Sequence, residues 1–257
     1  MNLLRKPFGL FWVLFVFGFF PTELFATEVD ATLQWVRTVS LSTTVSGVLA
    51  EVNVNRGDRV QAGQALSHLT DKLLQAEVVA SKARLKKAEN NRDEAQRELD
   101  RTQELYDRTL LSDHDLQLAI IQRDAAVAEL QSAIASKIKA ERELYYSVLR
   151  APFDAWVLQR NAEPGQTVIN KIQATPLIVL AEAGRMLARA LVGREMLNEF
   201  KLGRAAEVAV GGHHYPGKIV FVAMEPAKPD GDHYIVDVIF NTEQQVLRVG
   251  QAATVKL

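Results

Sequence analysis

The sequence predicts an elongated α+β protein. We expect a β-sandwich that is split by a long antiparallel α-helical coiled-coil hairpin and is followed by a small antiparallel β-barrel. Residues 71–150 contain no glycine or proline, and helix-forming residues dominate them. The segments on either side are rich in valine and threonine and are punctuated by glycine, which is typical of short strands and tight turns. The C-terminal third adds regularly spaced strand-like runs between Gly and Pro turns, which favours a barrel.

Composition excludes several classes of function. The 257 residues include no cysteine, so disulfides, thiolate metal sites and a cysteine nucleophile are ruled out. Thirty basic residues face 31 acidic ones, and this balance argues against a non-specific nucleic-acid binder. The chain has no Gly-x-Ser-x-Gly, phosphate-loop or His-Glu-x-x-His motif. We therefore expect a protein that is not an enzyme and carries no cofactor.

Residues 1–26 have the three-part pattern of a secretory signal peptide. Arg5 and Lys6 form a basic start, and Phe8 to Phe20 is an uncharged run of 13 residues. Ala26 supplies a small residue before the expected cleavage site. Since a membrane-spanning helix needs about 20 apolar residues, the run is too short for a typical span. We expect a secreted chain.

The block 71–150 predicts two antiparallel helices joined near Leu110–Ser112. A heptad stripe of small and aliphatic residues, with charged interruptions, runs from Leu74 to Thr109 and again from Leu116 to Val148. Ser112 suits the N-cap of the second helix, with Asp115 in the capping-box position. At 1.5 Å per residue each arm would be roughly 50–60 Å long. An arm of that length projects beyond any domain core.

The segments 45–70 and 151–181 are expected to be two halves of one sandwich. Each contains a strand, a glycine turn and a second strand, and Gly57 and Gly165 suit turn positions with positive φ. A short strand pair cannot bury a face alone, whereas two halves packed together can. The expected shared core consists of Val48, Val52, Val60, Leu66, Val157, Val168 and Ile178.

The barrel is expected over residues 182–257, joined by a strand from the segment 27–44. A short helix from Glu195 to Lys201 is expected to plug one end of the barrel. One group in the barrel could suit a transition metal, namely His213, His214, Asp232 and His233. Because the first two alternate across a strand beside the turn Gly211–Gly212, we interpret them as surface histidines and predict no metal site.

The order of these parts resembles a known family. The string Val45–Leu66 resembles the half-motif of lipoyl and biotinyl carrier domains, so the sandwich is expected to be lipoyl-like. The complete order, which includes Ala151-Pro152-Phe153-Asp154 and a final Leu-x-x-Gly strand, resembles the periplasmic adaptor, or membrane fusion, proteins of the HlyD and RND efflux type. Fuller members continue into a membrane-proximal β domain, which we expect to be missing or very small here.

This resemblance implies a periplasmic adaptor subunit of a tripartite efflux system. Such a protein links an inner-membrane transporter, here with the RND type favoured, to a TolC-like outer-membrane channel. It would be associated with the inner membrane and would form a homo-oligomeric ring, because a single rod cannot enclose a channel. Nucleic acid is not an expected partner.

Three residues near the expected turn match the tip signature of RND-type and related adaptors. Arg101, Leu105 and Ser112 have the spacing of that signature, and the resemblance implies that they bind the outer-membrane channel. The arginine would offer a fork of charged donors, and the leucine an exposed apolar contact. The alternative is that the first two belong to the helix surface and that the serine is only a cap.

Two other functions remain open. The protein could be a structural coiled-coil scaffold of the cell envelope. It could also be a lipoyl or biotinyl carrier, since Asp71-Lys72 follows the first half-motif and Lys72 would then hold the prosthetic group. Against the carrier, this lysine opens the helical block, and the hairpin separates two half-motifs that are contiguous in a carrier.

Overall fold

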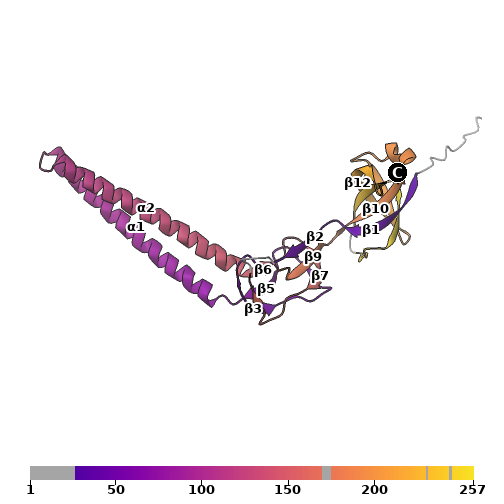
Figure 1. Ribbon diagram of the computed structural model, residues 1–257, viewed down its shortest axis with the longest axis horizontal. Coiled ribbons are helices and arrows are strands. Elements are labelled where there is room, and N and C mark those ends of the chain that lie inside the picture. The colour runs from indigo at the N-terminus through magenta and orange to yellow at the C-terminus, as the bar shows by residue number, and fades with distance from the viewer. Residues whose placement is uncertain (1–26, 170–174, 230, 243–244) are drawn as a thin grey trace, which may run out of the picture.

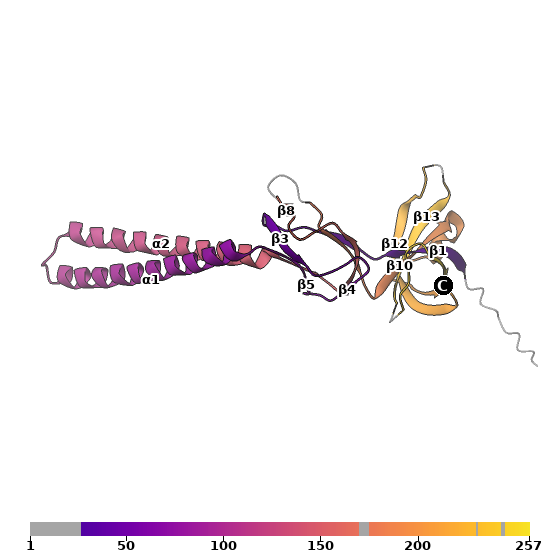
Figure 2. The same cartoon turned by 90° about the horizontal axis from the view of Figure 1, so that it is seen from below.

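The structure is a computed structural model that describes residues 27–169, 175–229, 231–242 and 245–257. The predicted signal peptide lies outside the described residues. A helical rod, a β-sandwich and a β-barrel follow one another along the long axis (Figure 1 and Figure 2). The predicted fold class is thereby confirmed. None of the helices in the described ranges is both long and apolar enough to cross a membrane.

The rod is an antiparallel pair of helices, α1 (Lys72–Asp107) and α2 (Asp113–Tyr146). The predicted stripe is buried or half-buried from Leu74 to Tyr106 in α1 and from Leu116 to Leu144 in α2. The predicted stripe did not include a column of alanines in α2 at seven-residue spacing, of which Ala119 and Ala140 are buried. In α2 the predicted stripe followed the larger side chains, although the small side chain of alanine is covered when two helices approach closely.

The ends of the rod differ from the prediction. The helical block was expected to reach Arg150, but the chain leaves α2 at Ser147 and forms strand β6 (Val148–Arg150), which pairs with β5 (Ala65–Leu69). The N-cap of the first helix is Asp71, and its side chain makes no capping hydrogen bond. The root of the rod is therefore fastened by strand pairing rather than by more helix.

The sandwich consists of two four-stranded sheets, and each sheet contains strands from both halves of the chain. One sheet has the order β2 (Thr38–Leu41), β9 (Ile178–Glu182), β7 (Ala155–Arg160) and β4 (Arg59–Val60). The other has the order β6, β5, β3 (Gly47–Val52) and β8 (Thr167–Val168). The halves thus exchange their short strands, because β4 pairs with β7 and β8 pairs with β3.

Two equivalent glycine turns make this exchange. Gly57 has a φ of 92° and Gly165 a φ of 87°, which confirms the predicted positive φ. The N–H of Gly57 donates to the carbonyl of Val157 at 2.8 Å, and the N–H of Gly165 donates to that of Leu49 at 2.7 Å. The two halves therefore bind each other through the same contact used twice.

The residue after each glycine completes the turn. In four glycine turns of the described chain, the side chain of the residue after the glycine accepts a hydrogen bond from the backbone N–H three residues before it. The four pairs are Asp58 from Asn55, Gln64 from Gln61, Gln166 from Glu163 and Gln251 from Arg248. Asp and Gln side chains there replace the water that an exposed turn amide would otherwise need. The pair Gly-Asp or Gly-Gln thus marks these turns in the sequence.

The core of the sandwich contains most of the predicted residues, with one clear error. Val60, Leu66, Val157, Val168 and Ile178 are buried in it, and Val52 packs against it half-buried. Val48, however, is 41% exposed, and its neighbour Leu49 is buried instead. A β-bulge between Leu49 and Glu51 changes which side chains face inward, so alternation from one end of β3 predicts the wrong face at the other end.

The barrel is closed by six strands in the order β1 (Glu28–Trp35), β10 (Arg185–Gly193), β13 (His233–Asn241), β12 (His213–Pro226), β11 (Ala205–Val210) and β14 (Ala252–Lys256). Only part of the 27–44 segment joins it, since β2 belongs to the sandwich. The expected plug helix is a 3₁₀ helix, η1 (Arg194–Glu199).

A buried carboxylate fixes the joint between barrel and sandwich. Glu182 forms an ion pair with Arg37, with 2.7 Å between Nε and Oε2, and its Oε1 accepts a hydrogen bond from Nε of Arg185 at 2.6 Å. Arg37 also lies over the ring of Phe153, 3.8 Å from its centre. Arg37 lies on the connection that leads from the barrel into the sandwich, and Arg185 lies on the connection that leads back into the barrel. Glu182 therefore holds the two connections together.

The bulge in β3 can be tested by two alanine substitutions. Ile178→Ala should lower the free energy of unfolding by about 2–5 kcal/mol, because it opens a cavity in the core, whereas Val48→Ala should cost less than about 1 kcal/mol because the side chain is largely in water. Urea unfolding followed by circular dichroism measures both. Equal losses would contradict the observed strand register.

Candidate functional site

The free end of the rod is a structured turn. Helix α1 ends at the C-cap Arg108, and Thr109 then adopts a φ of 57°. The N–H of Thr109 donates to the carbonyl of Tyr106 at 2.8 Å, and the N–H of Leu110 donates to that of Leu105 at 3.0 Å. These two bonds form a Schellman motif. Glycine usually occupies the left-handed position, and a β-branched threonine there costs about 1–2 kcal/mol of backbone strain.

Helix α2 begins with the predicted capping box. The N–H of Asp115 donates to Oγ of Ser112 at 3.3 Å, and the N–H of Ser112 donates to Oδ2 of Asp115 at 3.1 Å. Hydrogen bonds from the hydroxyl and then the backbone N–H of Ser112 lower the pKa of Asp115. A lowered pKa means that this contact stabilises the turn above the ordinary carboxyl pKa and is lost as pH falls through the lowered value.

A third contact joins the two helices across the turn. The hydroxyl of Tyr106 in α1 donates to Oδ1 of Asp113 in α2 at 2.5 Å. The hydrogen bond, and then the charge of Asp113, raise the pKa of Tyr106. With the Schellman motif and the capping box, this bond fixes the conformation of the tip.

The three predicted site residues lie in different environments. Arg101 is exposed near the end of α1 and forms an ion pair with Glu98 at 2.9 Å. Ser112 is exposed, but its side chain serves as the N-cap of α2. Leu105 is half-buried, so it is not the exposed apolar contact that was expected, and its position toward the seam between the helices explains why.

The structure offers a different apolar contact at the tip, namely Leu110. It is 66% exposed, and it lies in the turn itself rather than on a helix. Sequence reasoning used this residue only to locate the break. The signal that could have identified Leu110 as an exposed apolar contact is the presence of an aliphatic residue in a turn between two charged helices. The tip thus combines an exposed leucine with the exposed Arg101.

The other candidate groups do not converge on a chemical site. His213 and His214 are exposed on β12, and Nδ1 of His214 lies 2.5 Å from Oε1 of Glu207. Within the described ranges, no three His, Asp or Glu side chains gather in a way that could hold a metal ion. Lys72 is the exposed first residue of α1, rather than part of a β-turn.

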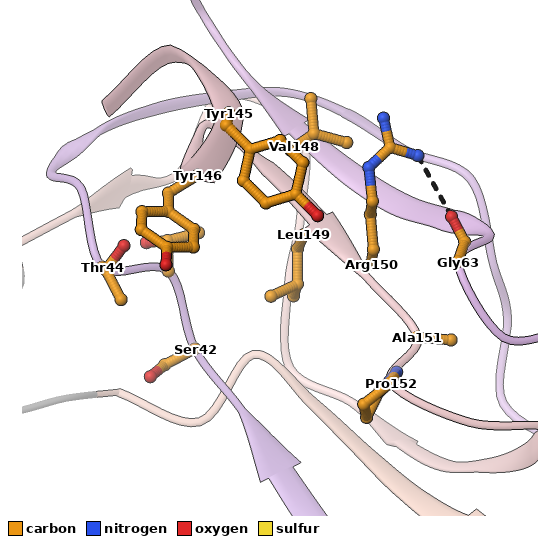
Figure 3. Close-up of a pocket in the computed structure, with 11 residues that line it drawn as sticks. Ser42, Thr44, Gly63, Tyr145, Tyr146, Val148, Leu149, Arg150, Ala151 and Pro152 are labelled. Carbon is orange, nitrogen blue, oxygen red and sulfur yellow. Dashed lines mark hydrogen bonds between the residues drawn. The ribbon is translucent and has the colours of Figure 1, made fainter. Parts of the chain in front are cut away.

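A pocket of about 360 Å³ lies at the other end of the rod, where α2 meets the sandwich. Figure 3 shows Tyr146 beside Thr44 at one side of it and Arg150 beside Gly63 at the other, with Tyr145 between them. The guanidinium of Arg150 donates to the carbonyl of Gly63 at 3.1 Å and is therefore engaged in the fold.

The strain at Thr109 gives a direct test of the turn. Thr109→Gly should stabilise the hairpin by about 1 kcal/mol, because glycine adopts positive φ without a steric penalty. Thr109→Ala is the matched control, since it shortens the side chain but keeps the penalty. Amide hydrogen exchange at the ends of both helices should slow only in the glycine variant; equal exchange in both variants would show that the turn is not strained.

Comparison with known proteins agrees with this architecture. Residues 37–177, more than half of the chain, match the model of the CzcB-like barrel-sandwich hybrid domain. The macrolide export protein MacA of Yersinia pestis is 32% identical over 200 residues, which cover 72% of this chain and 53% of that protein. The nodulation protein NolF of Rhizobium meliloti is 27% identical over 228 residues, which cover 87% of this chain and 60% of that protein. The chain thus spans little more than half the length of these relatives.

Two solved structures have the same fold. The membrane fusion protein Spr0693 of Streptococcus pneumoniae superposes with a TM-score of 0.66 at 16% identity, covering 89% of this chain and 97% of that one. An efflux transporter described as putative, from Bacteroides eggerthii, superposes with a TM-score of 0.67 at 18% identity, covering 90% of this chain and 68% of that one. The chain therefore belongs to the CzcB-like barrel-sandwich hybrid family, and its resemblance to the periplasmic adaptor, or membrane fusion, proteins is confirmed.

Proposed function

We propose that this protein is the periplasmic adaptor subunit of a tripartite efflux system. It connects an inner-membrane transporter, for which the sequence resemblance favours the RND type, to a TolC-like outer-membrane channel. The observation that carries the proposal is the tip, where a structured turn at the end of a long rod exposes Leu110, and where Arg101 is exposed within the last two helical turns of α1. The protein acts by connecting its partners rather than by catalysis.

The length and the charge pairing of the shaft also bear on this assignment. Helix α1 has 36 residues, so at 1.5 Å per residue it extends roughly 54 Å. Its charges are largely paired along the same helix, as in the contacts Lys86–Glu89 and Arg84–Glu77. Exposed pairs of this kind contribute little to stability, and the pair Arg101–Glu98 is of the same kind. The length of the shaft carries the tip away from the sandwich, while exposed apolar side chains such as Val79 and Ile121 lie along its sides.

The names of relatives point to export. One relative is a macrolide export protein, and a second, MdtA of Yersinia enterocolitica, is named a multidrug resistance protein and is 28% identical over 148 residues. Transferred to this chain, those names support a role in moving compounds out of the cell. Several copies side by side would be needed, because one rod cannot surround a conduit, and the signal-peptide pattern of residues 1–26 supports a periplasmic location at the inner membrane.

The proposal is tested by comparing tip and shaft. In Arg101→Glu the charged donor becomes an acceptor, and in Leu110→Asp the apolar contact becomes a carboxylate. Arg84→Glu is the matched control, because Arg84 also forms one ion pair at 2.9 Å within α1 but lies far from the tip. The tagged protein is purified from chemically cross-linked cell envelopes, and outer-membrane channel proteins are quantified by mass spectrometry.

Both tip variants should reduce the recovered channel by about tenfold or more, since the loss of a central contact commonly costs at least 1.4 kcal/mol. The Arg84→Glu variant should recover it normally, and circular dichroism should show equal helicity in all four proteins. If the original chain recovers no channel, or if both tip variants match the control, the tip does not bind a channel, and a scaffold role would fit better.

A further inference from the structure

A single side-chain hydrogen bond joins the two helices at the tip of the rod. The hydroxyl of Tyr106 donates to Oδ1 of Asp113 at 2.5 Å. Within residues 72–146, all of which are described, the other polar side-chain contact between α1 and α2 is the ion pair of Lys82 with Glu141. That pair is longer, with 3.7 Å between Nζ and Oε1, and it lies in the half of the rod that is closer to the sandwich. The polar link between the helix ends at the tip is therefore made by Tyr106.

The ring of Tyr106 belongs to the seam between the helices. It is half-buried, and it lies four residues after the buried Thr102. Residues four apart share one face of a helix, so Tyr106 continues the inner face of α1 to its last turn. A phenylalanine at this position would keep the ring in the seam and would remove only the hydroxyl that reaches α2.

Tyr106 contacts both ends of the turn. Its backbone carbonyl accepts the N–H of Thr109 at 2.8 Å, and its side chain holds Asp113, the first residue of α2. The neighbouring carbonyl of Leu105 accepts the N–H of Leu110 at 3.0 Å. The turn that exposes Leu110 is thus closed by backbone bonds on one side and by the tyrosine hydroxyl on the other.

Backbone strain opposes this closure. Thr109 has a φ of 57°, which is unfavourable for a β-branched residue. If the bonds of the Schellman motif open, Thr109 returns to the right-handed region and Leu110 loses its fixed position. A hydrogen bond to a charged carboxylate is one of the stronger kinds in proteins. The bond from Tyr106 to Asp113 therefore offsets the strain within the same turn.

We propose that Tyr106 is a positioning residue of the tip, whose hydroxyl keeps Leu110 in the orientation that the channel protein recognises. Tyr106 acts through Asp113 and the turn and does not itself touch the channel. This inference rests on the proposed function, because it concerns how the tip binds. The apparent affinity of a binding site depends on the fraction of molecules in the binding conformation, so loss of the bond weakens binding without abolishing it.

The first test removes the hydroxyl alone. Tyr106→Phe is compared with the original chain by the same recovery of channel proteins from cross-linked cell envelopes. It should lower the recovered channel by about fivefold, since a hydrogen bond to a charged group no longer favours the binding conformation. Tyr145→Phe is the matched control, because Tyr145 is 62% exposed near the other end of α2, and it should recover the channel normally. Circular dichroism should show the same helicity in all three proteins.

A rescue experiment separates positioning from direct contact. Thr109→Gly is added to Tyr106→Phe, because glycine adopts positive φ without the steric penalty. With the strain removed, the turn no longer needs the hydroxyl, and the double variant should recover at least half of the channel that the original chain recovers. A hydroxyl that touched the channel directly would not be replaced by a glycine three residues away.

A third measurement needs no channel. Amide hydrogen exchange at Leu110 reports the opening of its bond to Leu105 in the purified chain. Tyr106→Phe should speed this exchange by about fivefold, Thr109→Gly should slow it again in the double variant, and Tyr145→Phe should leave it unchanged.

The possible results distinguish this inference from the proposed function. Normal channel recovery by Tyr106→Phe, together with a loss in Leu110→Asp, would overturn the positioning role and leave the proposed function standing. A loss that Thr109→Gly does not restore would make the hydroxyl a direct contact, and unchanged exchange at Leu110 would show that the hydroxyl does not hold the turn; either result contradicts positioning. If the original chain recovers no channel, both the inference and the proposed function are wrong.

Discussion

The exchange of two short strands is the constraint on which the rest of this structure depends. Strand β4 crosses to β7, and β8 crosses to β3, so neither half of the sandwich has a complete sheet without the other. A further pairing between the two halves, of β5 with β6, fixes the root of the rod. The N–H of Leu69 donates to the carbonyl of Ser147 at 2.8 Å, which holds the start of α1 and the end of α2 at one edge. A hairpin of this length can project as one body only because both of its ends are fastened there.

The sequence was most informative where a physical period or a backbone restriction leaves few alternatives. Eighty residues without Gly or Pro can hardly form anything but long helices, and Gly57 and Gly165 were correctly expected at positive φ. These features depend on local chemistry alone. The split sandwich could be inferred for a similar reason, since short strand pairs on both sides of the hairpin need a partner to bury their faces.

The errors lie where tertiary contacts override a local pattern. A bulge in β3 moved Val48 to the surface, and pairing with β5 converted the expected helical end of α2 into β6. At the tip, the predicted heptad stripe passed through Thr102 and Tyr106 and left Leu105 beside the seam, where it is half-buried. Leu110 is exposed because the Schellman motif turns the chain away from the helix axis immediately before it.

The two ends of the molecule differ in structure. The tip is a small, strained and well-ordered surface that suits a specific protein contact, and strain in a turn is often found at such sites. The barrel lies at the other end, and Glu182 ties it to the sandwich through two arginines.

The central claim is that the tip, and not the shaft, meets an outer-membrane channel. Because the chain lacks cysteine, Leu110→Cys and Ala83→Cys each provide a single attachment point for a short photo-activated cross-linker in intact cells. Both positions are exposed on the rod. The account predicts one dominant cross-linked product from residue 110 that contains a TolC-like channel, and none from residue 83. Equal cross-linking of a channel from both positions, or from neither, would contradict it.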